Sequence, residues 1–172
     1  MNGDLYIIKY DSNGLQKWIK TLDSGAAESG RDITIDNSNF IYVSGNTNGS
    51  FDKFSIEGLS DSLVAKYDSE GNQIWIKQFG TEGSDGINIL SMDSANNFYI
   101  AGSTTGAIDN HTNAGGSDGV IMKMNSDGEF ISGGSGSGSG GSNSSAGGGA
   151  TERITGGAVH TCAIKADDSL QC

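Results

Sequence analysis

The sequence has few of the residues that general acid–base chemistry requires. Its 172 residues contain two histidines, His111 and His160. His111 follows Asp109-Asn110 in a polar segment, which predicts a solvated loop residue. Neither histidine lies near a serine or cysteine in a recognisable nucleophile motif, and the pattern His-Glu-x-x-His is absent. The sequence therefore names no catalytic residue, and we expect a protein that is not an enzyme.

Basic residues and long apolar runs are also scarce. Ten lysines and arginines stand against 21 aspartates and glutamates, which gives a net charge of −11. An acidic surface repels phosphate backbones, so nucleic acid is not an expected partner. No run of about 18 apolar residues predicts a membrane span. Residues 1–20 lack the charged start and apolar centre of a signal peptide.

What the sequence does contain is a repeat of 57 residues. Lys9-Tyr10-Asp11-Ser12 recurs as Lys66-Tyr67-Asp68-Ser69 and, weakened, as Lys123-Met124-Asn125-Ser126. Residues 4–60 and 61–117 are identical at 19 of 57 positions without any insertion. Such a period indicates one supersecondary unit whose copies bury their faces against one another. The shared positions that we interpret as structural are Trp18, Trp75, Gly14, Gly71, Gly128, Tyr42, Tyr99, Gly45 and Gly102.

Each repeat predicts two hairpins. In the first, Leu5–Tyr10 and Trp18-Ile19 are rich in aromatic and β-branched residues, and the turn between them is Asp11-Ser12-Asn13-Gly14. Aspartate begins such a turn by accepting backbone amides, and glycine supplies the positive φ that closes it. The second hairpin runs over 32–43 with a turn at 36–39. Four short strands per repeat predict an all-β fold of antiparallel propeller blades, two to three in number and incomplete as a ring.

These residues resemble a known family. Asp61–Asp68, Gly71, Trp75, Asp93, Asn96, Tyr99 and Gly102 are similar to the bacterial β-propeller repeat called SBBP. The resemblance covers 4–131 and implies four-stranded blades in a ring of about seven, without implying a reaction. It places one full blade at about 31–79, the outer half of a preceding blade at 4–22 and a following blade at 87–131. It also implies a bacterial surface or secreted protein.

The repeat stops at Ile131, and Ser132 stands where tryptophan is expected. Residues 132–150 have no apolar side chain larger than alanine, which predicts a flexible Gly/Ser linker, natural or engineered. Residues 151–172 resemble the start of an RCC1-type repeat through Gly156-Gly157, His160, Cys162 and Ala163, and this resemblance implies a structural role for His160. A generic hairpin is the alternative. We expect the chain to be a fragment of a longer multi-propeller protein.

The two cysteines suggest a disulfide. A three-residue loop at 166–168 pairs Lys165 with Ser169 and places Cys162 opposite Cys172, near disulfide distance. Such a bond implies an oxidising compartment and therefore an extracellular or cell-surface location. The spacing lacks a second ligand pair, so metal binding is the weaker interpretation.

Further residues are candidate ligand sites. The turns at Asp11, Asp68 and Asn125 offer oxygens to calcium, but they lack the later bidentate glutamate, so we interpret them as plain turns. We interpret Asp36 and Asp93 in the same way. Trp18 and Trp75 could stack on sugars, but their place beside isoleucine predicts wedges between blades. We therefore predict no cofactor.

The sequence favours a non-catalytic scaffold or binding module with a protein or glycan partner. The first alternative is a carbohydrate-binding or adhesion module that uses loops 46–60 and 103–117, the longest in each repeat. The second is an engineered or truncated propeller. Because two to three blades leave open faces, we expect isolated 1–131 to self-associate or to fold poorly.

Overall fold

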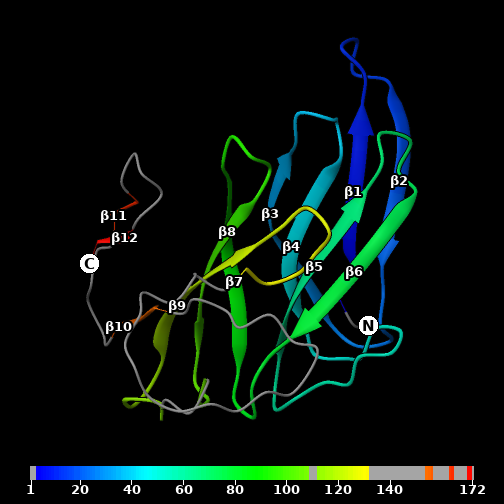
Figure 1. Cartoon of the computed structure of the whole chain (residues 1–172). Coiled ribbons are helices and arrows are strands. Elements are labelled where there is room, and N and C mark those ends of the chain that lie inside the picture. The colour runs from blue at the N-terminus through cyan, green and yellow to red at the C-terminus, as the bar shows by residue number, and fades with distance from the viewer. Residues whose placement is uncertain (1–2, 109–111, 132–153, 157–162, 165–169, 172) are drawn as a thin grey trace.

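The computed structural model describes residues 3–108 and 112–131, and the backbone of three short later strands at 154–156, 163–164 and 170–171. All regular structure in this part of the chain is β (Figure 1). The strands are β1 (Leu5–Tyr10), β2 (Gln16–Leu22), β3 (Glu28–Ile35), β4 (Ile41–Thr47), β5 (Asp61–Tyr67), β6 (Gln73–Phe79), β7 (Asp85–Met92), β8 (Phe98–Thr104), β9 (Asp118–Met124), β10 (Ile154–Gly156), β11 (Ala163–Ile164) and β12 (Leu170–Gln171).

The predicted turns form as the sequence requires. The Asp11 carboxylate accepts the backbone amides of Asn13 at 2.9 Å and Leu15 at 3.0 Å, and Gly14 has a φ of +77°. The same arrangement recurs at Asp68 and Asn125, each followed by a glycine of positive φ, Gly71 and Gly128. The Asp36 and Asp93 turns differ only in placing asparagine at the left-handed position.

Strands β1 to β10 assemble into three antiparallel sheets, and β11 and β12 form a fourth. β3, β4, β5 and β6 form one four-stranded sheet in sequence order, and its 28–79 span lies close to the 31–79 expected for one blade. β1 and β2 form the expected outer half of a preceding blade. β7, β8 and β9 begin the following blade. The fold is therefore all-β and built from propeller blades, and we call these three sheets the first, second and third blades.

Two separate segments pair with the outer edge of β9, where the fourth strand of the third blade is expected. Phe130 forms a bridge to Met124, where the repeat predicts that the outer strand begins. Farther along the same edge, β10 pairs antiparallel with β9, with Ile154 opposite Ile121. This pairing was not expected, because residues 151–172 were assigned to a separate segment. It satisfies backbone groups that an edge strand otherwise leaves unpaired.

The last two strands pair with each other. Ala163 lies opposite Gln171 and Ile164 opposite Leu170. This is the register that a three-residue loop predicts for the two cysteines. Cys162, Cys172 and His160 lie outside the described residues, so the disulfide stays a prediction.

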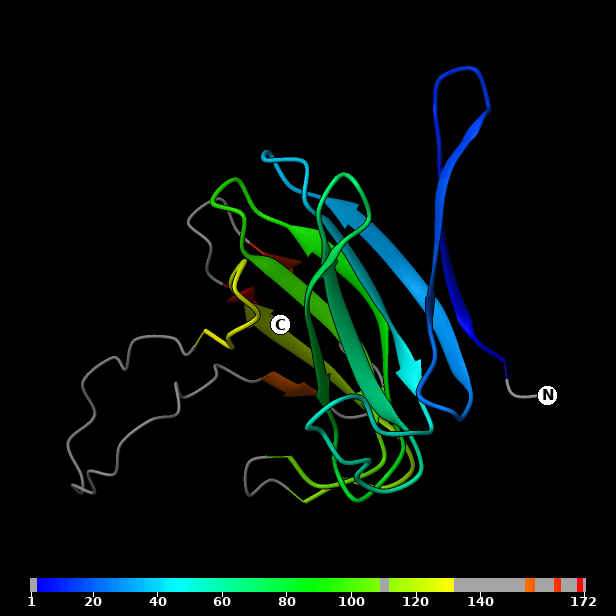
Figure 2. The ribbon, with the colours of Figure 1, turned by 90° about the vertical axis from the view of Figure 1, so that its right-hand side faces the viewer.

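The core lies between the blades. Figure 2 shows the β1–β2 hairpin to one side of the two larger sheets. One apolar cluster joins its Leu5, Ile7 and Leu22 to the face of the second blade, where Leu63 and Ala65 are fully buried. A second cluster joins the other face of the second blade to the third blade. Its members include Tyr42, Val64, Ile87, Leu90, Phe98, Ile100, Val120 and Met124.

Glycine is required where the two inner strands of each blade approach closely. A bulge follows Gly30 in β3, and Gly45 lies opposite Gly30 in β4. A Cβ at Gly45 would clash with the carbonyl oxygen of Ser29. Gly102 has the same relation to the Gly86 carbonyl beside the β7 bulge. These repeated glycines allow the tight approach, because no other residue lacks a Cβ.

Candidate binding site at the loop rim

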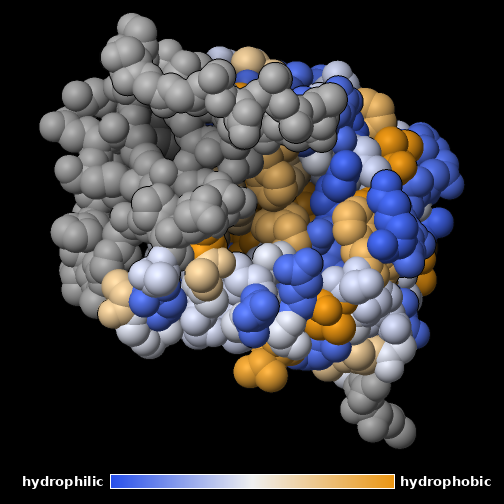
Figure 3. Space-filling view, turned by 60° about the horizontal axis from the view of Figure 1, so that its bottom comes forward, coloured by the Kyte–Doolittle hydropathy of each residue, from blue (hydrophilic) through white to orange (hydrophobic). Residues whose placement is uncertain are grey.

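The long loops predicted to bind a ligand, 46–60 and 103–117, lie at one end of the molecule. A cavity of about 530 Å³ opens there between the second and third blades. Glu57 of loop 46–60 and Ser103 and Ile108 of loop 103–117 contribute to its wall. In Figure 3, which brings this end toward the viewer, light-orange apolar surface lies in a recess with blue hydrophilic residues along part of its border. The two loops predicted from length alone therefore meet at one cavity.

The cavity combines apolar and acidic walls. Phe79, Ile108 and Met122 supply apolar surface, whereas Glu57, Glu82 and Asp85 supply carboxylates; no lysine or arginine is among its described lining residues. We call this feature the rim cavity. Glu57 and Glu82 are exposed and Asp85 is buried. Negative charge without a cationic neighbour favours a ligand that brings positive charge.

The buried carboxylates at this rim hold the loops in place. The two Asp61 carboxylate oxygens share the backbone amide of Glu57, and Oδ2 also accepts a hydrogen bond from Gln78 Nε2 at 2.8 Å. Asp85 accepts the amide of Thr81 at 2.6 Å. Each of these acids is the first residue of a strand, and its carboxylate accepts the backbone amide of the residue four positions earlier. Glu28 and Asp118 do the same for the amides of Ser24 and Ala114.

The charge of Asp61 is disfavoured by its surroundings. Burial raises the pKa of its carboxyl, and the nearby charges of Asp85 and Glu57 raise it further, against the lowering effect of the hydrogen bonds from Gln78 and from the Glu57 amide. Gly80 separates Asp61 from Asp85, and a Cβ there would clash with Asp61. Excess negative charge therefore extends from the rim cavity into the blade interface.

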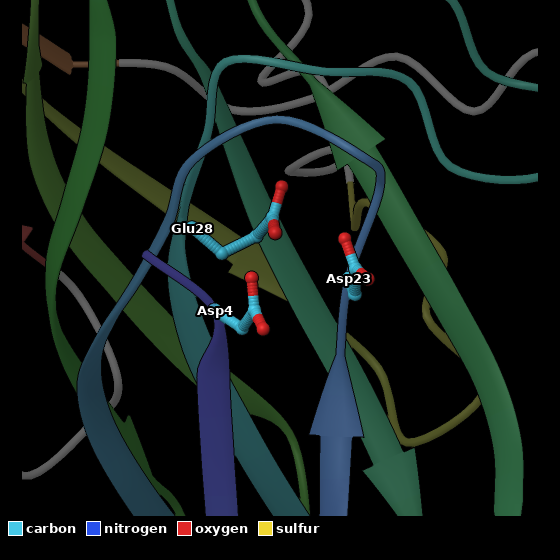
Figure 4. A group of neighbouring side chains, drawn as sticks. All are labelled: Asp4, Asp23 and Glu28. Atoms are coloured by element: carbon cyan, nitrogen blue, oxygen red, sulfur yellow. The ribbon is translucent and has the colours of Figure 1, made fainter. Parts of the chain in front are cut away.

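The first repeat carries a related group of acids. Asp4 precedes β1, Asp23 follows β2 and Glu28 begins β3, and one carboxylate oxygen from each lies within 4.8 Å of the others (Figure 4). Asp4 and Glu28 occupy the repeat positions of Asp61 and Asp85. Glu28 is already bonded to Ser24 and to the Thr47 hydroxyl. The group is thus a first copy of the loop-holding acids.

The two tryptophans occupy matching positions between blades. Trp18 of the first blade lies half-buried against Gly71, the turn glycine of the second blade, and its Nε1 donates to the Ser69 carbonyl at 3.2 Å. Trp75 packs its ring in the same way against Gly128 of the third blade, but its buried Nε1 has no hydrogen-bond partner among the described residues. Each ring thus lies on the turn of the following blade.

Two of the three repeated lysines connect one blade to the turn of the next. Lys9 Nζ donates to the Ser69 carbonyl at 2.7 Å, and Lys66 Nζ donates to the Ser126 carbonyl at 2.9 Å. Lys123, the third member, instead pairs with an acid of its own blade, Asp93 at 3.3 Å. The lysine–carbonyl contacts could not be predicted from the sequence, because every residue has a backbone carbonyl and the residue type does not show which one accepts.

The repeated tyrosines are packed inside the blades. Tyr42 is fully buried, and its hydroxyl donates to Asp36 Oδ2 at 3.0 Å. Burial, followed by this bond to Asp36, raises the pKa of Tyr42 strongly. Tyr99, its counterpart, is half-buried beneath Lys123 Nζ at 4.7 Å. Both tyrosines therefore serve the fold, and neither lines the rim cavity.

The turn residues that could offer oxygens to calcium accept hydrogen bonds from backbone amides of their own turns. The amide of Asn72 and then its side chain lower the pKa of Asp68, and the amide of Leu15 has the main lowering effect on Asp11. Their carboxylates cap turns at the end away from the rim cavity. His111 lies outside the described residues.

Comparison with known proteins agrees with the fold. Residues 24–52, which span β3 and β4, match the SBBP family, described as a beta-propeller repeat. No curated protein gives a significant match to the chain. The blades and this match together define a β-propeller repeat domain. The match does not reach 152–172, where the RCC1-type resemblance stays a prediction. Across the described residues, no helix is long and apolar enough to cross a membrane.

Proposed function

We propose that this propeller domain is a non-catalytic scaffold and binding module of a bacterial surface or secreted protein, and that the rim cavity binds a cationic ligand. The observation that carries the proposal is the cavity itself, where loops from two blades place Glu57, Glu82 and Asp85 around apolar surface. Propellers hold loops on a rigid body, and binding residues concentrate in such loops.

The non-catalytic role is supported by what the buried acids do. The carboxylate oxygens of Asp61 and Asp85 accept hydrogen bonds from loop amides and from Gln78. A general base instead needs an oxygen within reach of a substrate proton. The external location rests on the family resemblance and on the cysteine register, which would bring Cys162 and Cys172 together.

The test is a titration of the full chain with primary amines, namely putrescine, lysine and glucosamine, followed by amide chemical shifts. Shifts should cluster around the rim cavity. Glu57→Gln and Glu82→Gln should each weaken binding by about two- to fivefold, the range of one exposed charge pair. Asp127→Asn, an exposed acid in the far turn, is the matched control. No shifts at the rim, or equal loss in the control, would refute the cationic site.

A carbohydrate-binding module is the second candidate. It is favoured by the cavity lining, which combines the aromatic Phe79 with the polar residues Ser103 and Glu57 at one rim. A glycan array probed with the folded chain and with a variant altered in 103–117 distinguishes the two. Binding that the variant loses supports a sugar ligand, and a blank array with folded protein counts against it.

A further inference from the structure

The rim cavity has two unlike walls, which come from different stretches of the chain. All of its lining carboxylates belong to the stretch from Glu57 to Asp85, and we call Glu57, Glu82 and Asp85 the acidic wall. The lining residues from Ser103 onward include no charged side chain. Four of them are apolar, and we call them the apolar wall: Ala107, Ile108, Val120 and Met122. A ligand that fills the cavity therefore meets both carboxylates and hydrocarbon.

The acidic wall carries negative charge that the described residues leave unpaired. The segments that hold Glu57 and Glu82 are in contact, since the Leu59 amide donates to the Gly83 carbonyl at 2.8 Å and a Cβ on Gly58 would clash with the backbone of both Glu82 and Gly83. Both glutamates are exposed, and neither belongs to the two ion pairs of the described residues. Like charges on adjoining segments add their potentials, so a cation is attracted more strongly here than beside one carboxylate.

The negative charge extends over the whole rim end. Its described residues precede β1 and connect β2 to β3, β4 to β5, β6 to β7 and β8 to β9. Counted with the first residue of each following strand, they contain nine aspartates and glutamates and one lysine, Lys53. The repeated lysines Lys9, Lys66 and Lys123 contact the turns at the opposite end. A partner with several positive charges is therefore attracted to the rim end.

We propose that the rim cavity is a docking site for an extended peptide segment of a partner protein, in which basic and apolar residues alternate. Successive side chains of an extended chain point to opposite sides. Such a segment directs its basic side chains to the acidic wall and its apolar side chains to the apolar wall, which makes both charge and apolar surface complementary. This inference rests on the proposed function and narrows its cationic ligand to a peptide.

The size of the cavity and the sequence of the chain support this occupant. A volume of about 530 Å³ lies within the range of sites that enclose ligands much larger than a single amine. A diamine neutralises carboxylates but has no side chains that cover Ile108 and Met122. No two of the ten lysines and arginines in the chain are separated by a single residue, so the alternating segment comes from outside these 172 residues.

The test titrates the full chain with two capped peptides of equal composition, Lys-Leu-Lys-Leu-Lys-Leu and Lys-Lys-Lys-Leu-Leu-Leu, and with spermine. Calorimetry gives the affinities, and amide and methyl chemical shifts locate the site. The alternating peptide should shift resonances of both walls. It should bind at least about tenfold more tightly than the block peptide or spermine, because each of these leaves apolar surface of the cavity uncovered.

Two variants examine the walls separately. Met122→Gln keeps the length of the side chain and makes the apolar wall polar, so it should bring the affinity of the alternating peptide close to that of the block peptide. Met92→Gln, a change of the same kind outside the cavity lining, is the matched control and should preserve the difference between the peptides. Glu82→Gln, at an exposed position, should weaken the alternating peptide by about two- to fivefold.

The comparison of the two peptides on the unaltered chain decides the proposal even if Met122→Gln lowers stability. Tighter binding of the alternating peptide, with shifts at both walls, supports it. Equal affinities for the two peptides, or spermine binding as tightly as the alternating peptide, would overturn it. In that case rim binding of putrescine that Glu57→Gln weakens would leave the cationic site of the proposed function standing. No shift at the rim with any of these probes would overturn both.

Discussion

The lysine at the blade interface provides a stability test with an internal control. Lys66 is 7% exposed, donates to the Ser126 carbonyl of the third blade and lies 4.3 Å from the Phe40 ring centre. Lys66→Met keeps most of the apolar stem and removes the charge. Losing a charged hydrogen bond costs about 1.5–3 kcal/mol, and losing the cation–π contact costs about 0.5–2 kcal/mol. We therefore expect Lys66→Met to lower the free energy of unfolding by about 2–5 kcal/mol.

Lys123 is the matched control because it holds the same repeat position in the third blade. Its side chain is 24% exposed and its partner is Asp93, within its own blade. A partly exposed ion pair contributes about 0.2–1 kcal/mol, and the contact with Tyr99 adds about 0.5–1 kcal/mol. Lys123→Met should therefore cost about 1–2 kcal/mol, roughly half the loss at Lys66.

The assay is urea denaturation of the full chain followed by tryptophan fluorescence, since Trp18 and Trp75 both lie at blade interfaces. With a slope of about 2 kcal/mol per molar urea, the two variants should differ in midpoint by about 0.5–1 M. Equal midpoints for Lys66→Met and Lys123→Met would refute the argument that the lysine binds blade to blade.

Three further results are expected. Gly45→Ala should cost about 3 kcal/mol or more in chemical denaturation, because its Cβ meets backbone across the bulge; an unchanged midpoint would contradict this. Gly71→Ala should lower the free energy of unfolding more than Gly14→Ala does, although both glycines have positive φ, because of the two only Gly71 lies under Trp18. Equal losses of stability in the two variants would mean that Trp18 does not pack on Gly71. The pKa of the Asp61 carboxyl is raised in the folded state, so its contribution to stability increases as the pH falls through that pKa toward 3.8. The free energy of unfolding of the wild type, relative to that of Asp61→Asn, should therefore increase over this pH range. A difference that stays constant with pH would count against the raised pKa.

The sequence predicted the elements that depend on neighbouring residues. The turn at Asp11 and Gly14 combines an amide-accepting carboxylate with a residue that tolerates positive φ, and both requirements are visible in residue identity. The 57-residue spacing then placed Trp18 and Trp75 in matching surroundings. Loop length alone located the two loops that meet at the rim cavity.

The contacts that the sequence did not predict depend on backbone atoms brought together by stacking. The Lys66–Ser126 contact uses a carbonyl, which every residue has. The clash at Gly45 arises from a bulge one strand away. The capping of loop amides by Asp61 and Asp85 follows a spacing of four residues that could have been found by comparing the repeats.

The stacking of tryptophan on the turn of the following blade is the central claim, and proton chemical shifts test it most directly. Ring currents from Trp18 and Trp75 should displace the α-protons of Gly71 and Gly128 from ordinary glycine values. Gly14, which has no described heavy atom within 4 Å of its Cβ position apart from its chain neighbours, should show no displacement. Nuclear Overhauser contacts should join each ring to its glycine. Three glycines with the same unshifted resonances and no such contacts would contradict the stacked-blade structure.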